Sequence, residues 1–151
     1  MSIDFQFVGK CITEQDLNEF ETRHGVSLPD DYRRFMLACN GGTSVPQVYE
    51  TVSQLGVGLQ QLYSLHDDQP YDLDRKCKST DWEDAFSRGY LRIGRDAGGS
   101  GIFLSTRGDD RGCIFYFDRE EAVRAPEGPV KIADSFRQLM TSLSPVPSSK
   151  A

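Results

Sequence analysis

The first run of apolar residues at helical spacing begins after residue 13. Thr13 can serve as an N-cap, Asp16 stands at the capping-box position three residues later, and Leu17 and Phe20 form a narrow apolar stripe. Gly25 is the residue type that most often ends a helix in the left-handed conformation. The pattern predicts a first helix between Thr13 and Gly25, with its acidic side chains turned largely to water.

A second and stronger helical pattern follows Leu28-Pro29-Asp30-Asp31, where a proline at the start and acids in the first turn favour helix initiation. The apolar positions of this helix fall at i, i+3, i+4 and i+7, namely Tyr32, Phe35, Met36 and Cys39. Asn40-Gly41-Gly42 supplies residues that tolerate a left-handed stop. We therefore expect a helix with one buried face that ends near Asn40.

The middle of the chain, residues 43–78, has weaker periodicity. The pattern predicts short strands around residues 48–52 and 59–65. The run from Asp67 to Asp72 is typical of an exposed acidic loop, and residues 80–88, which include a tryptophan and a phenylalanine, predict a short helix.

From Tyr90 onward the pattern changes to that of a sheet. Apolar runs at residues 90–93, 102–105 and 113–117 are separated by turns rich in glycine and aspartate. The connection over residues 106–112 is too short for the crossover that parallel strands need. The three runs therefore predict an antiparallel meander.

A last helical stripe closes the pattern, with Asp134 or Ser135 as its cap. Its members are Ile132, Phe136, Leu139, Met140 and Leu143. Residues 144–151 are expected to form a flexible tail. Together the segments predict one α+β domain over residues 1–143, in which helices flank a central, twisted, mainly antiparallel sheet.

Composition agrees with one globular domain, because 151 residues with 38% hydrophobic and 26% charged content are enough for a single core. The formal net charge is −6, and residues 1–31 hold seven acids against two bases. Such a balance disfavours direct contact with nucleic acid or anionic lipid and favours a basic protein partner. Four widely spaced cysteines and the absence of a leader or membrane-spanning run predict a cytoplasmic protein with reduced thiols.

The sequence contains few groups suited to catalysis. His24 borders the first helix stop, where a cap is the simpler interpretation, and His66 stands beside two aspartates in a polar loop. The glycine-rich segment 94–101 lacks the Gly-Lys-Ser/Thr ending of a phosphate loop and precedes a strand, so we expect Asp96 to bond the backbone of a tight turn there. We predict no cofactor, no metal and no enzymatic activity; a hydrolase or metal enzyme built on His66 is the alternative.

Three segments in this order resemble the SUKH superfamily, which includes the fungal Smi/Knr regulators and bacterial immunity proteins. The first is Leu28-Pro29-x-x-Tyr32-x-x-Phe35-Met36-x-x-x-Asn40-Gly41-Gly42. The second is Leu91-x-Ile93-Gly94-x-Asp96-x-Gly98-Gly99. The third is Cys113-Ile114-Phe115-Tyr116-Phe117-Asp118, leading to Ile132-Ala133-x-Ser135-Phe136. The chain departs from its relatives at Phe117-Asp118-Arg119-Glu120, where a tryptophan and a histidine are common.

The resemblance implies an α+β recognition module without a cofactor. It suggests an immunity protein that binds and neutralises a cognate toxin, often a nuclease, with a Smi/Knr-type scaffold for an endogenous partner as the alternative. A basic toxin domain would fit acidic side chains at Glu14, Glu19, Glu21, Asp67, Asp68 and Asp72. The motif positions are expected to be mainly structural: Leu28, Pro29, Tyr32, Phe35, Asn40, Gly41, Gly42, Gly94, Asp96, Gly98 and Phe136.

Overall fold

The structure is a computed structural model that describes residues 4–6, 9–53, 55–65, 72–77, 85–117 and 129–145. Its helices are α1 (Glu14–His24), α2 (Asp30–Cys39), α3 (Leu73–Lys76) and α4 (Phe136–Thr141). Its strands are β1 (Asp4–Gln6), β2 (Gly42–Tyr49), β3 (Gly58–Leu62), β4 (Tyr90–Arg95), β5 (Gly101–Ser105), β6 (Ile114–Phe117), β7 (Val130–Ala133) and β8 (Ser144–Pro145).

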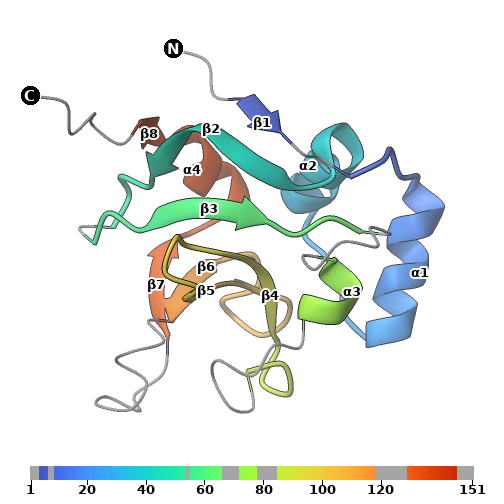
Figure 1. The fold of residues 1–151 in the computed structure, drawn as a ribbon. Coiled ribbons are helices and arrows are strands. Elements are labelled where there is room, and N and C mark those ends of the chain that lie inside the picture. Colours follow the sequence, from blue (N-terminus) through green and yellow to red (C-terminus); the bar gives the residue numbers. More distant parts are fainter. Residues whose placement is uncertain are drawn as a thin grey trace, which may run out of the picture.

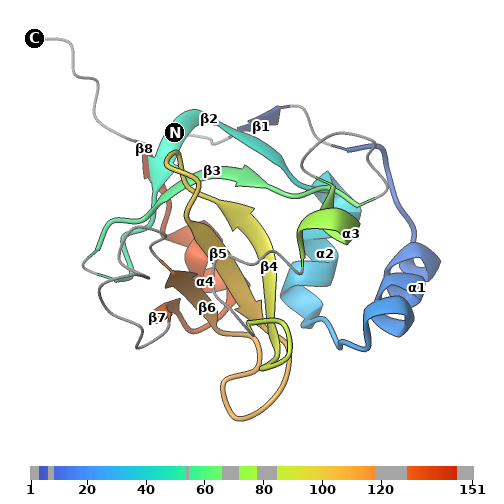
Figure 2. The ribbon, with the colours of Figure 1, turned by 60° about the horizontal axis from the view of Figure 1, so that its bottom comes forward.

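The strands form one antiparallel sheet in the order β1-β2-β3-β4-β5-β6-β7, and β8 adds a second short partner to β2 (Figure 1). Leu91 lies opposite Leu104, and Phe103 lies opposite Phe115, so the meander predicted for the C-terminal half is confirmed. The observed arrangement is the predicted α+β class, with a mainly antiparallel sheet and flanking helices. In Figures 1 and 2, α1, α2 and α3 gather at one end of the sheet and α4 lies behind it.

The two N-terminal helices begin and end as their sequences predict. Thr13 Oγ1 accepts a hydrogen bond from Asp16 N at 3.2 Å, and an Asp16 carboxylate oxygen accepts one from Thr13 N at 2.8 Å, which completes the capping box. Gly25 is left-handed. In α2, Pro29 is the N-cap and Asn40 ends the helix with a φ of 39°.

Aromatic side chains join the helices into the main core. The ring of Phe136 in α4 lies 5.1 Å from Tyr32 and 5.0 Å from Phe35, both in α2, measured between ring centroids. Phe35 in turn meets Phe5 of β1 at 5.5 Å. These edge and tilted contacts, favourable between aromatic rings, fix both helices against one face of the sheet.

The opposite face of β5 and β6 carries a smaller core. Because side chains alternate along a strand, Ile114 joins the main core while Phe103, Phe115 and Phe117 join Ala85 on the other face. The strands β5 and β6 are therefore apolar on both faces. This explains why they appear in the sequence as continuous apolar runs.

The C-terminal region differs from its prediction. Ile132 keeps helical spacing to Phe136 but lies in β7, where Ala133 pairs with Ile114 of β6. The predicted cap is confirmed at Ser135, whose side chain accepts from the Gln138 amide, and α4 begins at the next residue. Ser144 pairs with Tyr49, so the first two residues of the expected tail form β8. Residues 146–151 lie outside the described residues.

The middle region contains both predicted strands, earlier in the chain than expected, and one helix that was not predicted. The short helix α3 follows Asp72, close to the acidic loop that was expected to end there. Residues 85–89 form a turn instead of the end of the predicted helix, and residues 80–84 fall outside the described residues. No helix in the described part of the chain has the length and apolar character that crossing a membrane requires.

Candidate functional site

The acidic side chains predicted to bind a partner are partly committed to one arginine of α2. Arg33 contacts Glu14 at 2.5 Å and Glu21 at 3.0 Å, and it also donates to the side-chain oxygen of Asn18. Glu21 additionally accepts a hydrogen bond from the Leu28 amide at 2.7 Å. The pKa of Arg33 is raised: burial opposes the charge, but the two carboxylates outweigh it. This network joins α1 to α2 and partly neutralises the acidic side chains of α1.

Two of the other predicted acids, Glu19 and Asp72, lie within the described residues. Glu19 is exposed and accepts a hydrogen bond from Gln15 at 3.2 Å. Asp72 was expected in an exposed loop, but it is only 7% exposed at the start of α3, so it is a poor candidate for surface contact. Asp67 and Asp68 lie outside the described residues.

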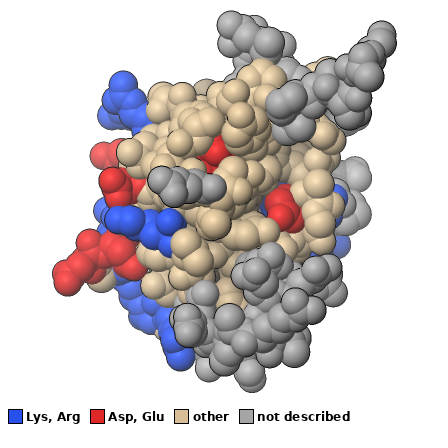
Figure 3. Space-filling model, turned by 90° about the vertical axis from the view of Figure 1, so that its left-hand side faces the viewer, with Lys and Arg blue, Asp and Glu red and all other residues tan. Residues whose placement is uncertain are grey.

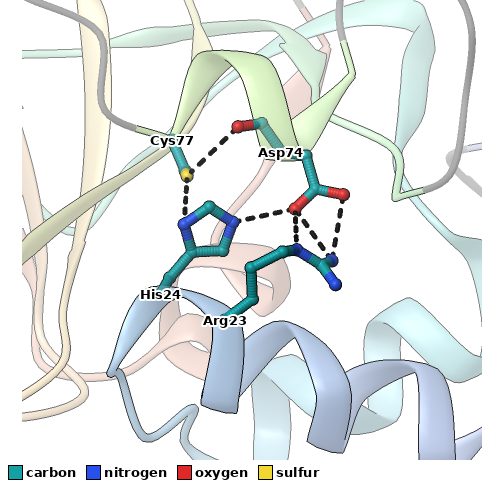
Figure 4. Close-up of polar contacts among 4 residues, drawn as sticks. All are labelled: Arg23, His24, Asp74 and Cys77. Atoms are coloured by element: carbon teal, nitrogen blue, oxygen red, sulfur yellow. Dashed lines mark hydrogen bonds and ion pairs between the residues drawn. The ribbon is translucent and has the colours of Figure 1, made fainter.

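A second polar cluster brings a thiol, an imidazole and a carboxylate together between α1 and α3 (Figure 4). His24 Nε2 lies 2.8 Å from an Asp74 oxygen, and His24 Nδ1 lies 3.9 Å from the sulfur of Cys77. Arg23 also contacts the Asp74 carboxylate, through two nitrogens at 2.9–3.1 Å. We call these four residues the α1–α3 cluster.

The order thiol, imidazole, carboxylate is that of a nucleophile, a base and an orienting group. Because the Asp74 carboxylate can only accept, His24 Nε2 carries a proton, and in the neutral ring Nδ1 is left to accept from the thiol. The environment opposes catalysis. Cys77 is 1% exposed and follows the last turn of a helix, where the dipole disfavours a thiolate.

The α1–α3 cluster is instead well placed to hold two helices together. The His24 ring packs on Phe20 at 4.5 Å between centroids, and its side chain is 8% exposed. Burial alone would raise the pKa of Asp74, but the hydrogen bonds and charges of His24 and Arg23 lower it overall. His24 was predicted to cap α1. Its main partner is 50 residues away, and nothing in the local sequence indicates that partner.

The family-motif residues contact the chain's own backbone. Asn40 donates to the carbonyl oxygens of Lys10 and Leu65 at 2.8 and 3.0 Å and accepts from the Leu65 amide at 2.8 Å. Gly41 has a φ of +78°, and a Cβ there would lie 2.6–2.7 Å from the carbonyl oxygens of Tyr63 and Leu62. This motif therefore joins the end of α2 to the segment after β3.

The glycine-rich turn after β4 is organised by Asp96, as predicted. One Asp96 oxygen accepts from the amides of Gly98 at 3.0 Å and Ser100 at 2.8 Å, and the other accepts from the Tyr116 hydroxyl at 2.8 Å. Gly99 has the positive φ expected in this turn. The turn amides thus bind a carboxylate of the protein itself, where a phosphate loop would offer them to a ligand.

The remaining motif residues lie in the core. Leu28, Tyr32 and Phe136 are at most 2% exposed. Within the described ranges, no group of three or more histidine, cysteine, aspartate or glutamate side chains could hold a metal ion. His66, the basis of the metal alternative, is outside those ranges.

A comparison with known protein families identifies the family of the chain. Residues 11–142 match the model of the SMI1 / KNR4 family (SUKH-1). A search of the curated proteins found no match. Since the matched segment covers most of the chain, from before α1 to the end of α4, the protein belongs to the SMI1 / KNR4 family (SUKH-1).

Proposed function

We propose that this protein is a non-enzymatic binding protein that neutralises a cognate toxin, a basic domain of the nuclease type, by direct protein–protein contact. Membership of the SUKH-1 family is the observation that carries the proposal, because SUKH proteins include toxin-immunity proteins. The protein would act stoichiometrically in the cytoplasm of the cell that makes the toxin. Such a role needs a stable, specific surface and no reacting group.

The arrangement of the motif residues supports a binding role. The side chains of Asn40 and Asp96 form hydrogen bonds with groups of the protein itself. Gly41 and Gly94 lie so close to neighbouring backbone that a Cβ would not fit without a shift. The motif therefore maintains the fold and leaves the outer surface free to differ between proteins with different partners. The burial of Cys77 supports the same interpretation, since this thiol, which has the His24 imidazole beside it, is out of direct reach of a substrate.

Charge supports a basic partner at long range. The chain carries −6 in total, whereas the described residues hold nearly as many basic as acidic side chains. Glu14 and Glu21 share Arg33, so steering by the net charge fits the structure better than a compact acidic patch on α1. Complementary net charge accelerates encounter more than it adds affinity.

The test is titration calorimetry of the purified protein against the C-terminal toxin domain encoded beside its gene, at two salt concentrations, with a toxicity-rescue assay in cells. We expect tight binding that weakens at the higher salt concentration, together with rescue. Absence of both binding and rescue would contradict the immunity role. The family description names the SMI1 and KNR4 proteins, so an endogenous partner sought by co-purification is then the second candidate.

Glu19→Lys provides a direct check on the acidic side chains of α1. Glu19 is exposed and is not paired with Arg33, so its reversal changes charge without disturbing the network that joins α1 to α2. Slower association with an unchanged dissociation rate would support long-range steering. A faster dissociation would place α1 within the interface.

A further inference from the structure

Two segments of the chain are almost free of charge. Residues 41–65 contain one charged residue, Glu50, and residues 138–145 contain none, although 26% of the whole chain is charged. The fold brings the two segments together. Tyr49 is the pairing partner of Ser144, and the Thr51 hydroxyl donates to the Ser142 carbonyl oxygen at 2.6 Å.

This juxtaposition produces an uncharged face at the end of the β2–β3 hairpin. The hairpin end lies on the left-hand side of Figure 1, and Figure 3 shows this side face on. Most of the described surface in the centre of Figure 3 belongs to residues other than Lys, Arg, Asp and Glu. Val52 is 39% exposed and Leu55 is 58% exposed at the hairpin tip. We call residues 51–53, 55–56 and 142–145 the hairpin surface.

The hairpin tip is held in shape by the one charged residue of its segment. Glu50 is 1% exposed, and its carboxylate accepts from the Ser53 amide at 3.0 Å, the Ser53 hydroxyl at 2.6 Å and the Val57 amide at 3.1 Å. The Glu50 amide also donates to the Val57 carbonyl oxygen at 2.9 Å. A buried carboxylate is tolerated only when it is well hydrogen-bonded, and here the bonds are made to residues of the hairpin loop.

The loop is also attached to the body of the protein through Thr51 and Ser142 at the end of α4. Ordering a loop in advance lowers the entropy lost when it binds, so exposed apolar side chains on an ordered loop are efficient contact points. Depletion of charge together with exposed apolar side chains is typical of the centre of a protein interface.

We infer that the hairpin surface is the contact centre for the protein partner, and that the partner meets it with an uncharged, apolar patch. The inference rests on the proposed function. The occupant follows from charge: nucleic acid and anionic membranes need Lys or Arg side chains, which the hairpin surface lacks. A basic side chain of the partner would lose its water there, and the residues of the hairpin surface include no Asp or Glu to pair with it. The carboxylate of Glu50 is already bonded to the loop.

The test uses the full chain and the toxin domain of the preceding experiment. Val52→Asp and Leu55→Asp each place a charge at the centre of the hairpin surface. Thr22→Asp adds the same charge at an exposed position of α1, at the other end of the molecule (Figure 1). We expect each hairpin variant to weaken binding at least about tenfold. Thr22→Asp should bind within about twofold of the unmodified protein.

The result separates the inference from the proposed function. If the unmodified protein neither binds nor rescues, the proposed function fails and this inference fails with it. If it binds and both hairpin variants bind equally well, only the inference is overturned. Circular dichroism and thermal unfolding of the variants confirm that the fold is intact, and Leu55→Ser repeats the loss without introducing a charge.

A photo-crosslinking amino acid gives a second measurement that does not depend on affinity. Placed at position 55, it should crosslink to the toxin domain, and placed at position 19 on α1 it should not. Crosslinking from position 19 alone would overturn the inference. A crosslink from position 55 to a second copy of this chain, with a dimer seen by analytical ultracentrifugation, would also overturn it by making the hairpin surface a self-association site.

Discussion

His24 Nε2 and the carboxylate of Asp74 are 2.8 Å apart, although 50 residues separate them in the chain. The contact joins the last turn of α1 to α3, and Arg23 adds a second donor to the same carboxylate. The imidazole is packed on Phe20, so ring orientation and hydrogen bond support each other. A thiol lies on the other side of the ring, yet the same geometry that resembles a catalytic arrangement also explains how two helices are fixed.

Replacing Asp74 with asparagine should change how stability depends on pH. Burial would raise the pKa of Asp74, but His24 and Arg23 lower it overall, so the unfolded chain binds the proton more readily than the folded one. The contribution of Asp74 is therefore complete above its unfolded pKa of about 3.9 and is lost as pH falls through the lower folded pKa. We expect the urea midpoint of Asp74→Asn to fall less steeply below about pH 4.

Urea unfolding between pH 2.5 and pH 7 checks this prediction, with Glu19→Gln as the control. Glu19 is an exposed carboxylate on α1 and accepts only a hydrogen bond from Gln15 among the contacts described. At pH 7, Asp74→Asn should lower the free energy of unfolding by about 1–2 kcal/mol through weakened charged hydrogen bonds. Parallel acid limbs for the unmodified protein and Asp74→Asn would show that the pair contributes nothing.

The four cysteines should react with a thiol reagent in the order of their access. Cys11 is exposed, Cys39 and Cys113 are half-buried, and Cys77 is buried. Burial raises the pKa of Cys39, and burial is also the largest cause of the raised pKa of Cys113, so both hold less thiolate near neutral pH. We expect Cys11 to be alkylated first and Cys77 only on unfolding.

Mass spectrometry after brief iodoacetamide treatment at pH 7.5 measures the order. His24→Gln serves as the control. If the imidazole does not activate the thiol, the alkylation rate of Cys77 in the native variant should be no higher than in the unmodified protein. If Cys77 is alkylated before Cys11, and if its alkylation is slower in His24→Gln, the result would indicate an activated thiol and would support catalysis.

Gly41 and Gly25 allow steric and backbone effects to be separated. Both have positive φ, +78° and +66°, but a Cβ at Gly41 would lie 2.6–2.7 Å from two carbonyl oxygens and one at Gly25 would meet nothing within 4 Å. Gly25→Ala should therefore lower the free energy of unfolding only by the strain of an alanine in the left-handed conformation, about 1–2 kcal/mol. Gly41→Ala should lower the free energy of unfolding by at least about 2 kcal/mol more, since the backbone must move to make room for the Cβ. Similar losses for both variants, measured by urea unfolding, would contradict the close approach.

Much of the fold could be predicted where its causes are local. Three features depend on residues only a few positions apart, and their sequence patterns were sufficient to predict them. They are the capping box of Thr13 and Asp16, the left-handed end of α2 at Asn40 and the turn bonded by Asp96. The antiparallel order of β4, β5 and β6 followed from short connections. Each of these features depends on the residue types present and on little else.

The failures share a non-local cause. Ile132 has helical spacing to Phe136, but it lies in a strand instead of a helix. The reason is that the edge of β6 provides hydrogen-bond partners for the backbone of β7. The tail expected from Ser144 begins instead with β8, which pairs with a strand almost one hundred residues earlier in the chain. The pairing of a predicted acid with Arg33 is non-local as well, because Arg33 lies 19 residues after Glu14 and meets it only when α1 packs on α2.

The α1–α3 cluster and the hairpin surface also depend on contacts that no local sequence pattern indicates. No local signal connects His24 with Asp74, or Thr51 with Ser142. A signal for the hairpin surface was present, however, in the near absence of charge over residues 41–65. Charge depletion becomes informative once the fold shows which uncharged segments lie together.

Replacing Glu50 with glutamine should loosen the β2–β3 hairpin tip. The amide nitrogen of glutamine donates where the carboxylate accepts, so either the Val57 amide or the Ser53 amide loses its partner. An unsatisfied buried donor costs about 1–3 kcal/mol, and we expect Glu50→Gln to lower the free energy of unfolding by this amount. Ser53→Ala is the matched control. It removes the hydroxyl that donates to Glu50 and accepts from the Leu55 amide, but it keeps both amide bonds to the carboxylate. Because the Leu55 amide is at an exposed site where water can replace the hydroxyl, the loss should be about 1 kcal/mol or less. Hydrogen exchange at Ser53 and Val57 distinguishes the two variants, because only Glu50→Gln should accelerate exchange at one of these amides. Unchanged exchange rates at both amides would show that the carboxylate does not hold the tip.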